Sequence, residues 1–265
     1  MKQLKSKSLK DYTSFHIGYK AEIFIPESIQ ELTELLHDTP DPIILGGGTN
    51  ILFHNDTKRP IILTTSVQKV TRLGQGSVRV ECGKKMGNIL PFAQGVPATC
   101  GGMVYMNFGA FNYETGSFVR QAICFNKNTK HIDHLSHADC CFKYRSSIFQ
   151  KNQYVILEVD FQFLDPLYEP NKLLEIRKKK TPMKLKNTGS VFKNPKGNKT
   201  AGELIEQAGC KNFKVGGAAI WDKHCNYIIN TGKATSDDVL ELIKKIKEKV
   251  KKKFKISLEE EICIY

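Results

Sequence analysis

The sequence predicts an α+β protein, and three observations lead to that class. Strand, helix and strand patterns follow one another within the first 66 residues. Residues 154–163 are apolar at every second position, which is the period of a half-buried strand. A long amphipathic helix ends near residue 254. Together these stretches predict separate helical and sheet segments within one chain.

The first block covers residues 1–66. A strand is expected over 21–25, and Ser28 with Glu31 three positions later has the spacing of a capping box that opens a helix. Residues 42–45 and 60–64 complete the pattern as two strands. We expect an α/β subdomain here.

The second block covers residues 67–166. Strands are expected over 77–82 and 121–126, with a hairpin turn over 126–130. The strand over 154–163 places five apolar residues on one face, and Glu158, Asp160 and Gln162 on the other.

The third block covers residues 167–265. We expect helices over 172–180 and 201–208, the second closed by Gly209 in the left-handed conformation. Thr235 and Asp238 can cap a long helix that reaches about Phe254. A short terminal strand is expected over 256–265.

The composition is that of a soluble globular protein, with 40% hydrophobic and 25% charged residues among 265. No apolar run approaches the roughly 20 residues that span a bilayer, and the first residues lack the apolar stretch of a secretion signal. We expect a cytoplasmic protein. Eight cysteines occur without a Cys-x-x-Cys spacing, so reduced and mostly buried thiols are expected, and no metal site.

The net charge of +13 comes largely from lysine runs at 178–180 and 244–255. The second run is interleaved with apolar residues at helical spacing, which indicates a solvated lysine-rich face. A positive field suits anionic small molecules. Nothing in the sequence has the arginine and aromatic stripe of a nucleic-acid surface, and we expect no nucleic-acid partner.

Three motifs suggest chemistry. The segment 187–195 has the sequence Asn-Thr-Gly-Ser-Val-Phe-Lys-Asn-Pro. Gly189 could turn the hydroxyl of Ser190 towards a cavity. The same residues are also typical of a core strand that ends in a turn. The runs 46–50 and 95–102 are glycine-rich and follow or precede apolar segments. Their backbone amides could form two anion nests, which would suit a diphosphate, and a plain turn is the alternative for the first.

Two charged positions complete the candidate set. Arg145 stands in an apolar context, where its planar fork could grip a carboxylate or pair with a surface acid. Glu259, Glu260 and Glu261 form an acidic run, and strand alternation would separate Glu260 from the other two.

These motifs, in this order along the chain, resemble the UDP-N-acetylenolpyruvoylglucosamine reductase family, in its shorter branch. The resemblance covers nearly the whole chain and implies an FAD-binding fold of the vanillyl-alcohol-oxidase/PCMH type. It implies two FAD-binding subdomains, residues 1–66 and 67–166, and a C-terminal α+β substrate-binding domain, residues 167–265. FAD and NADPH are the implied cofactors.

The resemblance also implies roles for residues. Arg145, Ser190 and Glu261 would be catalytic, and Tyr144, Lys180, Lys193 and Asn194 would bind substrate. The implied FAD-binding residues are Gly46, Gly47, Gly48, Thr49, Asn50, Ile51, Gly95, Val96, Pro97, Ala98, Thr99, Gly101, Gly102, Asn107, Gly109 and Ala110.

The implied reaction is the reduction of UDP-N-acetylglucosamine enolpyruvate to UDP-N-acetylmuramate with NADPH, in peptidoglycan precursor synthesis. Arg145 would hold the substrate carboxylate, Ser190 would donate a proton, and a protonated Glu261 would hydrogen-bond the carboxylate. We expect a monomer. Two alternatives stay open: another FAD oxidoreductase on the same scaffold, and a non-catalytic nucleotide-sugar-binding relative with a short 83–92 region. His224 is expected to belong to the local architecture rather than to the catalytic set.

Overall fold

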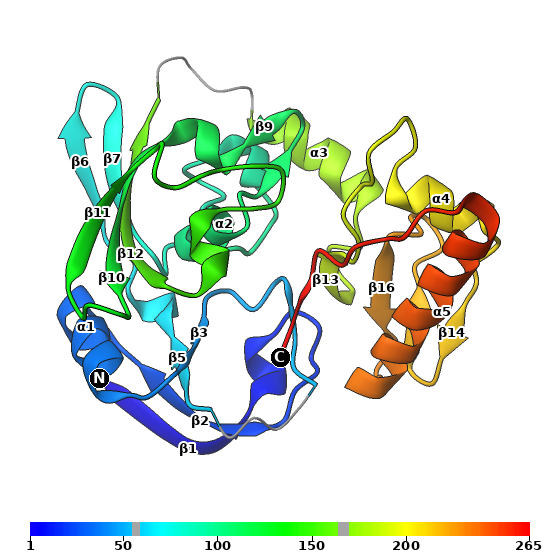
Figure 1. The fold of residues 1–265 in the computed structure, drawn as a ribbon, viewed down its shortest axis with the longest axis horizontal. Coiled ribbons are helices and arrows are strands. Elements are labelled where there is room, and N and C mark those ends of the chain that lie inside the picture. The colour runs from blue at the N-terminus through cyan, green and yellow to red at the C-terminus, as the bar shows by residue number, and fades with distance from the viewer. Residues whose placement is uncertain (55–58, 164–169) are drawn as a thin grey trace. The chain divides into compact units, whose positions relative to one another are not determined.

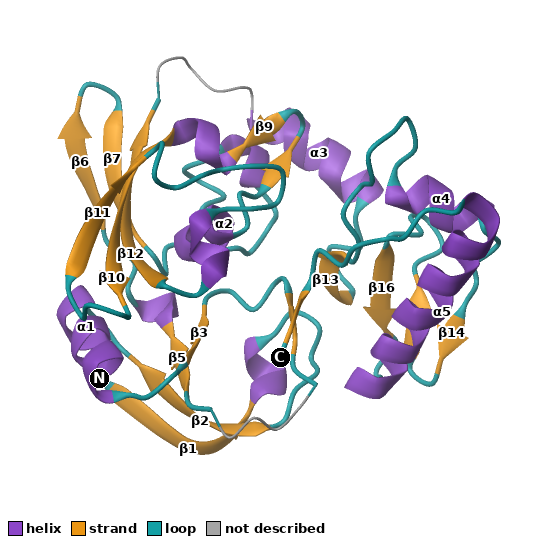
Figure 2. Cartoon of the chain, in the orientation of Figure 1, coloured by secondary structure: helices purple, strands orange, loops and turns teal. Residues whose placement is uncertain are grey.

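A computed structural model describes residues 1–54, 59–163 and 170–265 (Figures 1 and 2). The chain divides into two compact units. The first unit comprises residues 1–7, 21–47 and 58–175, and the second comprises 8–20, 48–57 and 176–265. The predicted division into three parts stays a prediction, and its boundary at 166/167 lies outside the described residues. Each unit is described here by itself.

A four-stranded sheet begins the first unit. Its order is β1 (Lys2–Ser8), β2 (Lys20–Ile25), β5 (Ile61–Leu63) and β3 (Ile43–Leu45). β5 pairs in parallel with both β2 and β3. The three predicted strands of this block are therefore confirmed.

Helix α1 (Ile29–Asp38) begins where the sequence predicts. The Ser28 hydroxyl accepts a hydrogen bond from the Glu31 N–H at 3.2 Å, as an N-cap should. The reciprocal half of the capping box is absent, because the Glu31 carboxylate accepts from the Glu27 N–H and from the Met1 ammonium instead. The helix buries Leu32, Leu35 and Leu36.

The second sheet of this unit has five antiparallel strands. They are, in order, β11 (Ile132–Ser136), β10 (Val119–Asn126), β12 (Tyr154–Gln162), β7 (Ser77–Glu81) and β6 (Val70–Gly74). Helix α2 (Cys100–Tyr105) packs against β12 and β7. A small hairpin, β8 (Gly109–Ala110) with β9 (Tyr113–Glu114), follows α2. The predicted strands and the turn over 126–130 are confirmed.

Asp160 departs from the simple alternation expected of β12. It lies on the polar side of the strand, yet it is only 3% exposed. Arg79 grips its carboxylate with two hydrogen bonds of 2.7 and 2.9 Å, and Gln121 donates a third at 2.6 Å. Burial alone raises the pKa of Asp160, but these hydrogen bonds outweigh burial and lower it. The Asp160 carboxylate is buried because its partners reach it from the two flanking strands.

The second unit contains a four-stranded sheet. Its order is β13 (Lys186–Ser190), β16 (Tyr227–Asn230), β15 (Ala218–Ile220) and β14 (Lys214–Val215). Helix α5 (Ser236–Phe254) packs on β14 and β15, and α4 (Ala201–Gln207) packs on α5. The core of the unit gathers apolar residues from these elements and from Phe15, Ile17 and Leu52 near the start of the chain.

The helix ends of this unit follow local sequence signals. Thr235 and Asp238 form the predicted cap of α5, with both reciprocal hydrogen bonds present. Thr200 and Glu203 cap α4 in the same way, and Gly209 follows α4 at a φ of +79°. The predicted helix over 172–180 corresponds to α3 (Pro170–Lys180). The predicted cap of α5, the helix before Gly209 and the helix over 172–180 are confirmed, whereas the cap of α4 was not predicted.

The predicted terminal strand over 256–265 is wrong in extent. Only β17 (Cys263–Ile264) is a strand, and it pairs in parallel with β4 (Ile51–Leu52). Residues 256–262 are irregular apart from a single bridge between Phe192 and Glu260. Residues 256–265, the terminal segment, change partner along their length. They contact residues 187–195, the serine segment, and then β4, and therefore cannot form one regular strand.

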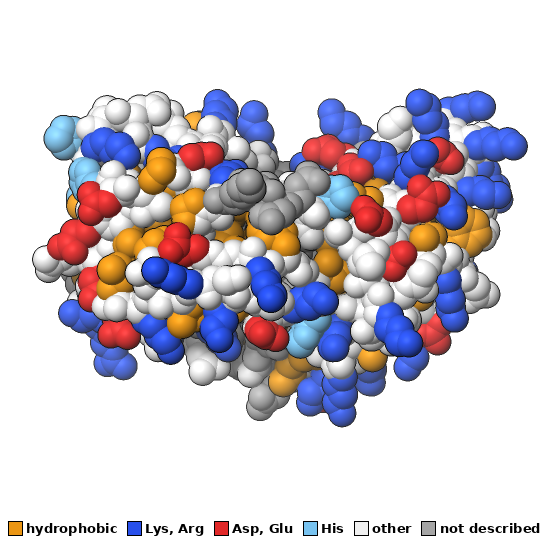
Figure 3. Space-filling view, turned by 90° about the horizontal axis from the view of Figure 1, so that it is seen from below, with side chains coloured by type: hydrophobic (Ala, Val, Ile, Leu, Met, Phe, Trp, Pro, Cys, Tyr) orange, Lys and Arg blue, Asp and Glu red, His pale blue; other side chains and the backbone are white. Residues whose placement is uncertain are grey.

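The surface agrees with the composition. Most lysines of α5 are exposed while its apolar face is buried, as predicted, and Figure 3 shows basic side chains with acidic ones among them on the side that it draws. Six of the eight cysteines are buried and none forms a disulfide. Across the described ranges, no helix is both long and apolar enough to cross a bilayer.

Candidate active site

Ser190 lies at the end of β13, directly after a backbone irregularity. The pairing of β13 with β16 shifts between Asn187 and Ser190, and Gly189 adopts a φ of +80°. The Asn187 side chain accepts a hydrogen bond from the Gly189 N–H at 2.8 Å. A Cβ at position 189 would meet nothing within 4 Å, so the glycine is needed for its backbone angle rather than for space. The backbone freedom expected of Gly189 is confirmed, and the turning of the Ser190 hydroxyl towards a cavity stays a prediction.

The terminal segment lies beside the serine segment. The Glu261 N–H donates to the Val191 carbonyl at 2.8 Å, and the Lys193 N–H donates to the Glu259 carbonyl at 2.9 Å. These two bonds flank the bridge between Phe192 and Glu260. The fold thus brings two of the predicted catalytic residues, Ser190 and Glu261, onto adjacent backbone segments within one unit.

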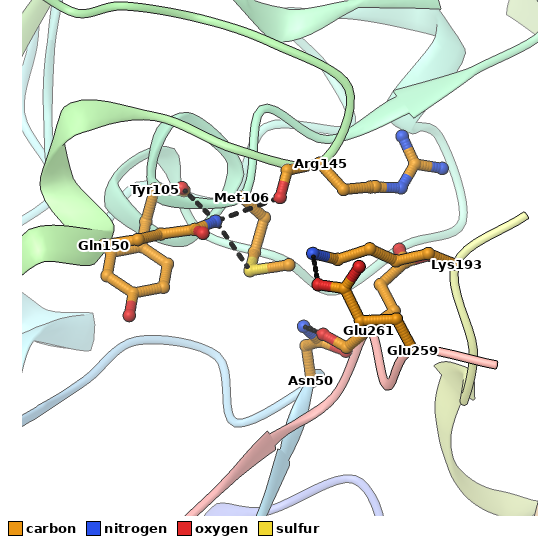
Figure 4. A network of polar contacts seen from close by, with 8 residues as sticks. All are labelled: Asn50, Tyr105, Met106, Arg145, Gln150, Lys193, Glu259 and Glu261. Carbon is orange, nitrogen blue, oxygen red and sulfur yellow. Dashed lines mark hydrogen bonds and ion pairs between the residues drawn. The ribbon is translucent and has the colours of Figure 1, made fainter. Parts of the chain in front are cut away.

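The three terminal glutamates have different surroundings. Glu259 forms an ion pair with Lys193 at 2.5 Å, and Glu260 forms one with Lys247 at 2.8 Å. The Glu261 carbonyl accepts a hydrogen bond from the Asn50 amide at 3.0 Å (Figure 4). Glu261 is half-buried, and its predicted selection over its two neighbours stays a prediction.

Burial affects two titratable groups around these segments. It raises the pKa of the Cys263 thiol to about 11, so the thiol stays protonated near neutrality. It also lowers the pKa of His224, whose Nδ1 accepts the Asn226 N–H at 3.2 Å. A neutral His224 is consistent with the architectural role expected for it.

The predicted substrate-binding residues of this unit occupy distinct places. Lys180 is exposed at the end of α3. The Asn194 carbonyl oxygen of the side chain accepts the Ala201 N–H at 3.0 Å, which ties the end of the serine segment to the start of α4. The Lys193 ammonium is held by Glu259. Their contacts with substrate stay predictions.

Arg145, in the first unit, has an unusual backbone. Its φ is +52°, in the left-handed region that a bulky side chain seldom adopts. Its guanidinium donates to the Gly109 carbonyl at 2.8 Å and lies 5.1 Å from the centre of the Tyr144 ring. The Gln150 amide donates to the Arg145 carbonyl at 3.1 Å (Figure 4). The arginine is therefore pre-positioned from both its backbone and its side chain.

The Asn107 side chain makes its hydrogen bonds to other residues of the protein. It is 1% exposed, its amide donates to Glu114 and to the Lys143 carbonyl, and its oxygen accepts the Gly116 N–H. These bonds orient the loop that carries Tyr144 and Arg145. A contact of Asn107 with FAD stays a prediction.

Within the first unit, Gly46 and Gly47 of the first glycine run contact the second run. A Cβ on Gly46 would lie 2.3 Å from the Thr99 hydroxyl, and one on Gly47 would lie 2.4 Å from the Pro97 carbonyl oxygen. A side chain at position 46 or 47 would therefore clash with residues 97–99. In addition, the Thr99 hydroxyl is buried and has no hydrogen-bond partner in the described part of the chain. Backbone amides with no side chains between them and one spare hydroxyl suit the diphosphate and sugar groups of FAD.

The remaining predicted cofactor residues lie around this contact. Gly95 has a φ of +82°, and Gly101 packs at the end of β7, where its Cβ would lie 3.3 Å from that of Cys82. Gly109 faces the Arg145 guanidinium, since a Cβ there would lie 2.9 Å from it. Gly48, Thr49, Asn50 and Ile51 belong to the second unit and run into β4. Their role in FAD binding stays a prediction.

Arg145 belongs to the first unit, and Ser190 and Glu261 belong to the second. The convergence of all three therefore stays a prediction. Sequence reasoning missed Asn226, whose side chain makes two hydrogen bonds to Phe192, and it missed the bond from Asn50 to Glu261. The sequence signal closest to Asn226 was His224, two positions earlier, because the hydrogen-bond partner of an amide side chain cannot be inferred from its neighbours in the sequence.

Comparison with known proteins gives concordant results. Residues 181–265 match the family model for the C-terminal domain of UDP-N-acetylenolpyruvoylglucosamine reductase. The reductase of that name from Caldicellulosiruptor bescii is 36% identical over 98% of this chain and 89% of the relative. The one from Fusobacterium nucleatum is 33% identical over 100% of this chain and 99% of its own.

A solved structure extends the comparison to the fold. The crystal structure of the reductase from Thermus caldophilus superimposes with a TM-score of 0.81 at 26% sequence identity, covering 100% of this chain and 98% of that one. The predicted α+β fold class is confirmed by this match. The resemblance first suggested by scattered motifs holds along the whole length of the sequence, and the chain belongs to the UDP-N-acetylenolpyruvoylglucosamine reductase family.

Proposed function

We propose that this protein is the NADPH-dependent FAD enzyme that reduces UDP-N-acetylglucosamine enolpyruvate to UDP-N-acetylmuramate for peptidoglycan precursors. Membership in the reductase family supports the reaction and the two cofactors. The observation that carries the proposal is the hydrogen-bonded contact between the serine segment and the terminal segment, which sets Ser190 beside Glu261. We further propose that the enzyme works as a monomer in the cytoplasm.

The residues that would hold FAD are the facing glycine runs and Thr99. Their fit is supported by the contacts of Gly46 and Gly47 with 97–99, which leave no room for side chains, and by the unpartnered Thr99 hydroxyl. FAD, when bound, supplies the ring that carries hydride from NADPH to the substrate. The protein positions the cofactor and the substrate and supplies the electrostatic field around them.

Arg145 is proposed to bind the carboxylate of the enolpyruvyl group. A guanidinium already fixed by the Gly109 carbonyl and lying over the Tyr144 ring loses little freedom when it binds an anion. Preorganised donors stabilise charge best where it develops, and negative charge develops towards this carboxylate.

Ser190 is proposed to deliver the proton to the carbon next to the carboxylate. A hydroxyl is a weak acid and works only at close range, so its backbone must be held rigidly. The bulge at Gly189 and the bonds at Val191 provide that rigidity. Glu261, in its protonated form, is proposed to hydrogen-bond the same carboxylate.

The decisive experiment is an anaerobic titration of the purified flavoprotein. NADPH should bleach the flavin absorbance, and stoichiometric UDP-N-acetylglucosamine enolpyruvate should restore it while UDP-N-acetylmuramate appears. Rapid recovery in air with no response to the enolpyruvyl substrate would instead identify an oxidase on this scaffold. A colourless protein that still binds the nucleotide sugar would identify a non-catalytic relative.

A further inference from the structure

Asn226 is a buried residue whose side chain makes both of its hydrogen bonds to the backbone of Phe192. It is 4% exposed. Its side-chain oxygen accepts the Phe192 N–H at 2.9 Å, and its amide donates to the Phe192 carbonyl at 2.8 Å. Its own carbonyl accepts the Val191 N–H at 2.9 Å. Three bonds from one residue therefore hold two consecutive residues after Ser190.

The Asn226 side chain forms its hydrogen bonds just beyond the end of the pairing between β13 and β16. The ladder between β13 and β16 stops at the pair Ser190 and Tyr227. A carboxamide offers one acceptor and one donor in a plane, as a peptide group does. Asn226 thus extends the pairing onto Phe192 by two bonds that the backbone of β16 does not supply.

The opposite edge of the same stretch carries the terminal segment. The Val191 carbonyl accepts the Glu261 N–H, and the Lys193 N–H donates to the Glu259 carbonyl. Phe192 directs its own N–H and carbonyl to the Asn226 side. The stretch 191–193 is held between Asn226 and the terminal segment, with Ser190 at its start and Glu261 attached to its far edge.

We propose that Asn226 is a positioning residue that sets Ser190 and Glu261 relative to each other through the stretch 191–193. The inference rests on the proposed function for its catalytic readout. Removing the carboxamide releases Phe192 and leaves only the backbone bond at Val191 on this edge, so both proposed catalytic residues shift together. A displacement of about 1 Å at a reacting group costs on the order of 100-fold in rate.

The test uses the holoenzyme in single-turnover experiments with three variants. Asn226→Leu keeps the volume but removes both side-chain bonds. Asn226→Asp keeps an acceptor for the Phe192 N–H, but its ionised carboxylate faces the Phe192 carbonyl. The matched control is Asn126→Leu, because Asn126 is also 4% exposed and bonds a backbone turn, at Asn128 and Thr129, in the first unit.

Flavin reduction by NADPH should be unchanged in all variants, whereas reoxidation by the enolpyruvyl substrate should slow about 10- to 100-fold in Asn226→Leu. The control should reoxidise at the wild-type rate. In Asn226→Asp the rate relative to wild type should recover as pH falls, because the protonated acid regains the donor. Equal reoxidation rates in Asn226→Leu and wild type would overturn the proposal, and so would an equal loss in Asn126→Leu.

Hydrogen–deuterium exchange gives a readout independent of turnover. Asn226→Leu, or Asn226→Asp at neutral pH if the leucine variant does not fold, should accelerate exchange of the Phe192 amide and also of the Glu261 amide. The Glu261 amide does not touch Asn226, so its loss of protection would demonstrate the coupling. Unchanged exchange at Glu261 would refute the inference. Failure of wild-type reduced enzyme to respond to substrate would refute only the proposed function.

Discussion

The glycine contact of the first unit and the serine segment of the second are shaped by opposite means. Gly46 and Gly47 meet residues 97–99 because side chains are missing there. The stretch after Ser190 is instead held by side chains that are present, with Asn226 on one edge and the bond from Asn50 to Glu261 beyond the other. One region is defined by exclusion of atoms and the other by added hydrogen bonds.

This difference determines how each region should fail. Substitutions that add atoms should damage the proposed cofactor site, whereas substitutions that remove atoms should damage the proposed catalytic segments. The first kind of damage should appear as loss of bound flavin, and the second as slow chemistry with flavin still bound. Five substitutions follow, one of them a control, beginning with the largest expected effect.

Ser190→Ala removes the proposed proton donor without adding atoms. General acid catalysis contributes roughly 10²- to 10⁴-fold, so reoxidation of the reduced enzyme by substrate should slow by about that factor. Flavin content and reduction by NADPH should match wild type in stopped-flow absorbance. Equal loss in both half-reactions would remove Ser190 from the proton-donor role.

Gly47→Ala adds one methyl group 2.4 Å from the Pro97 carbonyl oxygen, which is backbone and cannot move aside cheaply. We expect a loss of about 1–3 kcal/mol in the free energy of unfolding and a purified protein depleted of FAD. Flavin absorbance per protein and thermal melting would measure both.

Gly87→Ala is the matched control for that experiment. Its new Cβ would lie 3.5 Å from the Gln94 Cα, an ordinary contact in the same unit. Its unfolding free energy should change by less than about 1 kcal/mol, with flavin retained. If both alanine variants kept their FAD equally well, close backbone approach would not define the cofactor site.

Thr99→Val sharpens the contrast, because it removes the single hydroxyl that faces Gly46 without adding bulk. The buried hydroxyl has no partner in the described residues, and such a group costs about 1–3 kcal/mol. The FAD-free variant should therefore be as stable as wild type or more stable, while its FAD affinity falls about tenfold. Calorimetric titration with FAD would show this, and unchanged affinity would exclude Thr99 as a ligand.

The smallest effect concerns pH and the second unit. Burial holds the pKa of His224 below its ordinary value of 6.5, so below that pH the unfolded chain binds a proton that the folded chain does not. Stability should therefore fall as pH drops below about 6.5 towards the folded pKa. His224→Gln should flatten this part of the melting-temperature profile relative to wild type. Parallel profiles would show that His224 does not titrate in this range.

Features with local causes could be predicted from the sequence. The caps of α4 and α5 lie within three residues of the helix ends that they satisfy, and Gly209 closes α4 by its own backbone freedom. The left-handed angle at Gly189 was predicted for the same reason. In each case the residue and its physical consequence are neighbours in the chain.

Features that depend on partners far away in the sequence could not be predicted. Asp160 is buried because Arg79 and Gln121 reach it from flanking strands, and the terminal strand is short because its partners lie on two different segments. The role of the Asn226 amide could not be predicted, because it depends on the contact with Phe192. The family motifs indicated which residues of the site matter but not what holds them in place.

The pairing of β17 with β4 has a consequence for biosynthesis. Asn50 and Glu261 are 211 positions apart, which a ribosome elongating at about 5–20 residues per second covers in roughly 10 to 40 seconds. Throughout that interval the nascent chain carries Leu52 and Phe53, both buried in the folded protein, without their final neighbours. Translation thus delivers the strand that pairs with β4 and the proposed catalytic carboxyl group within the same few residues, and a chain terminated before residue 261 lacks both at once.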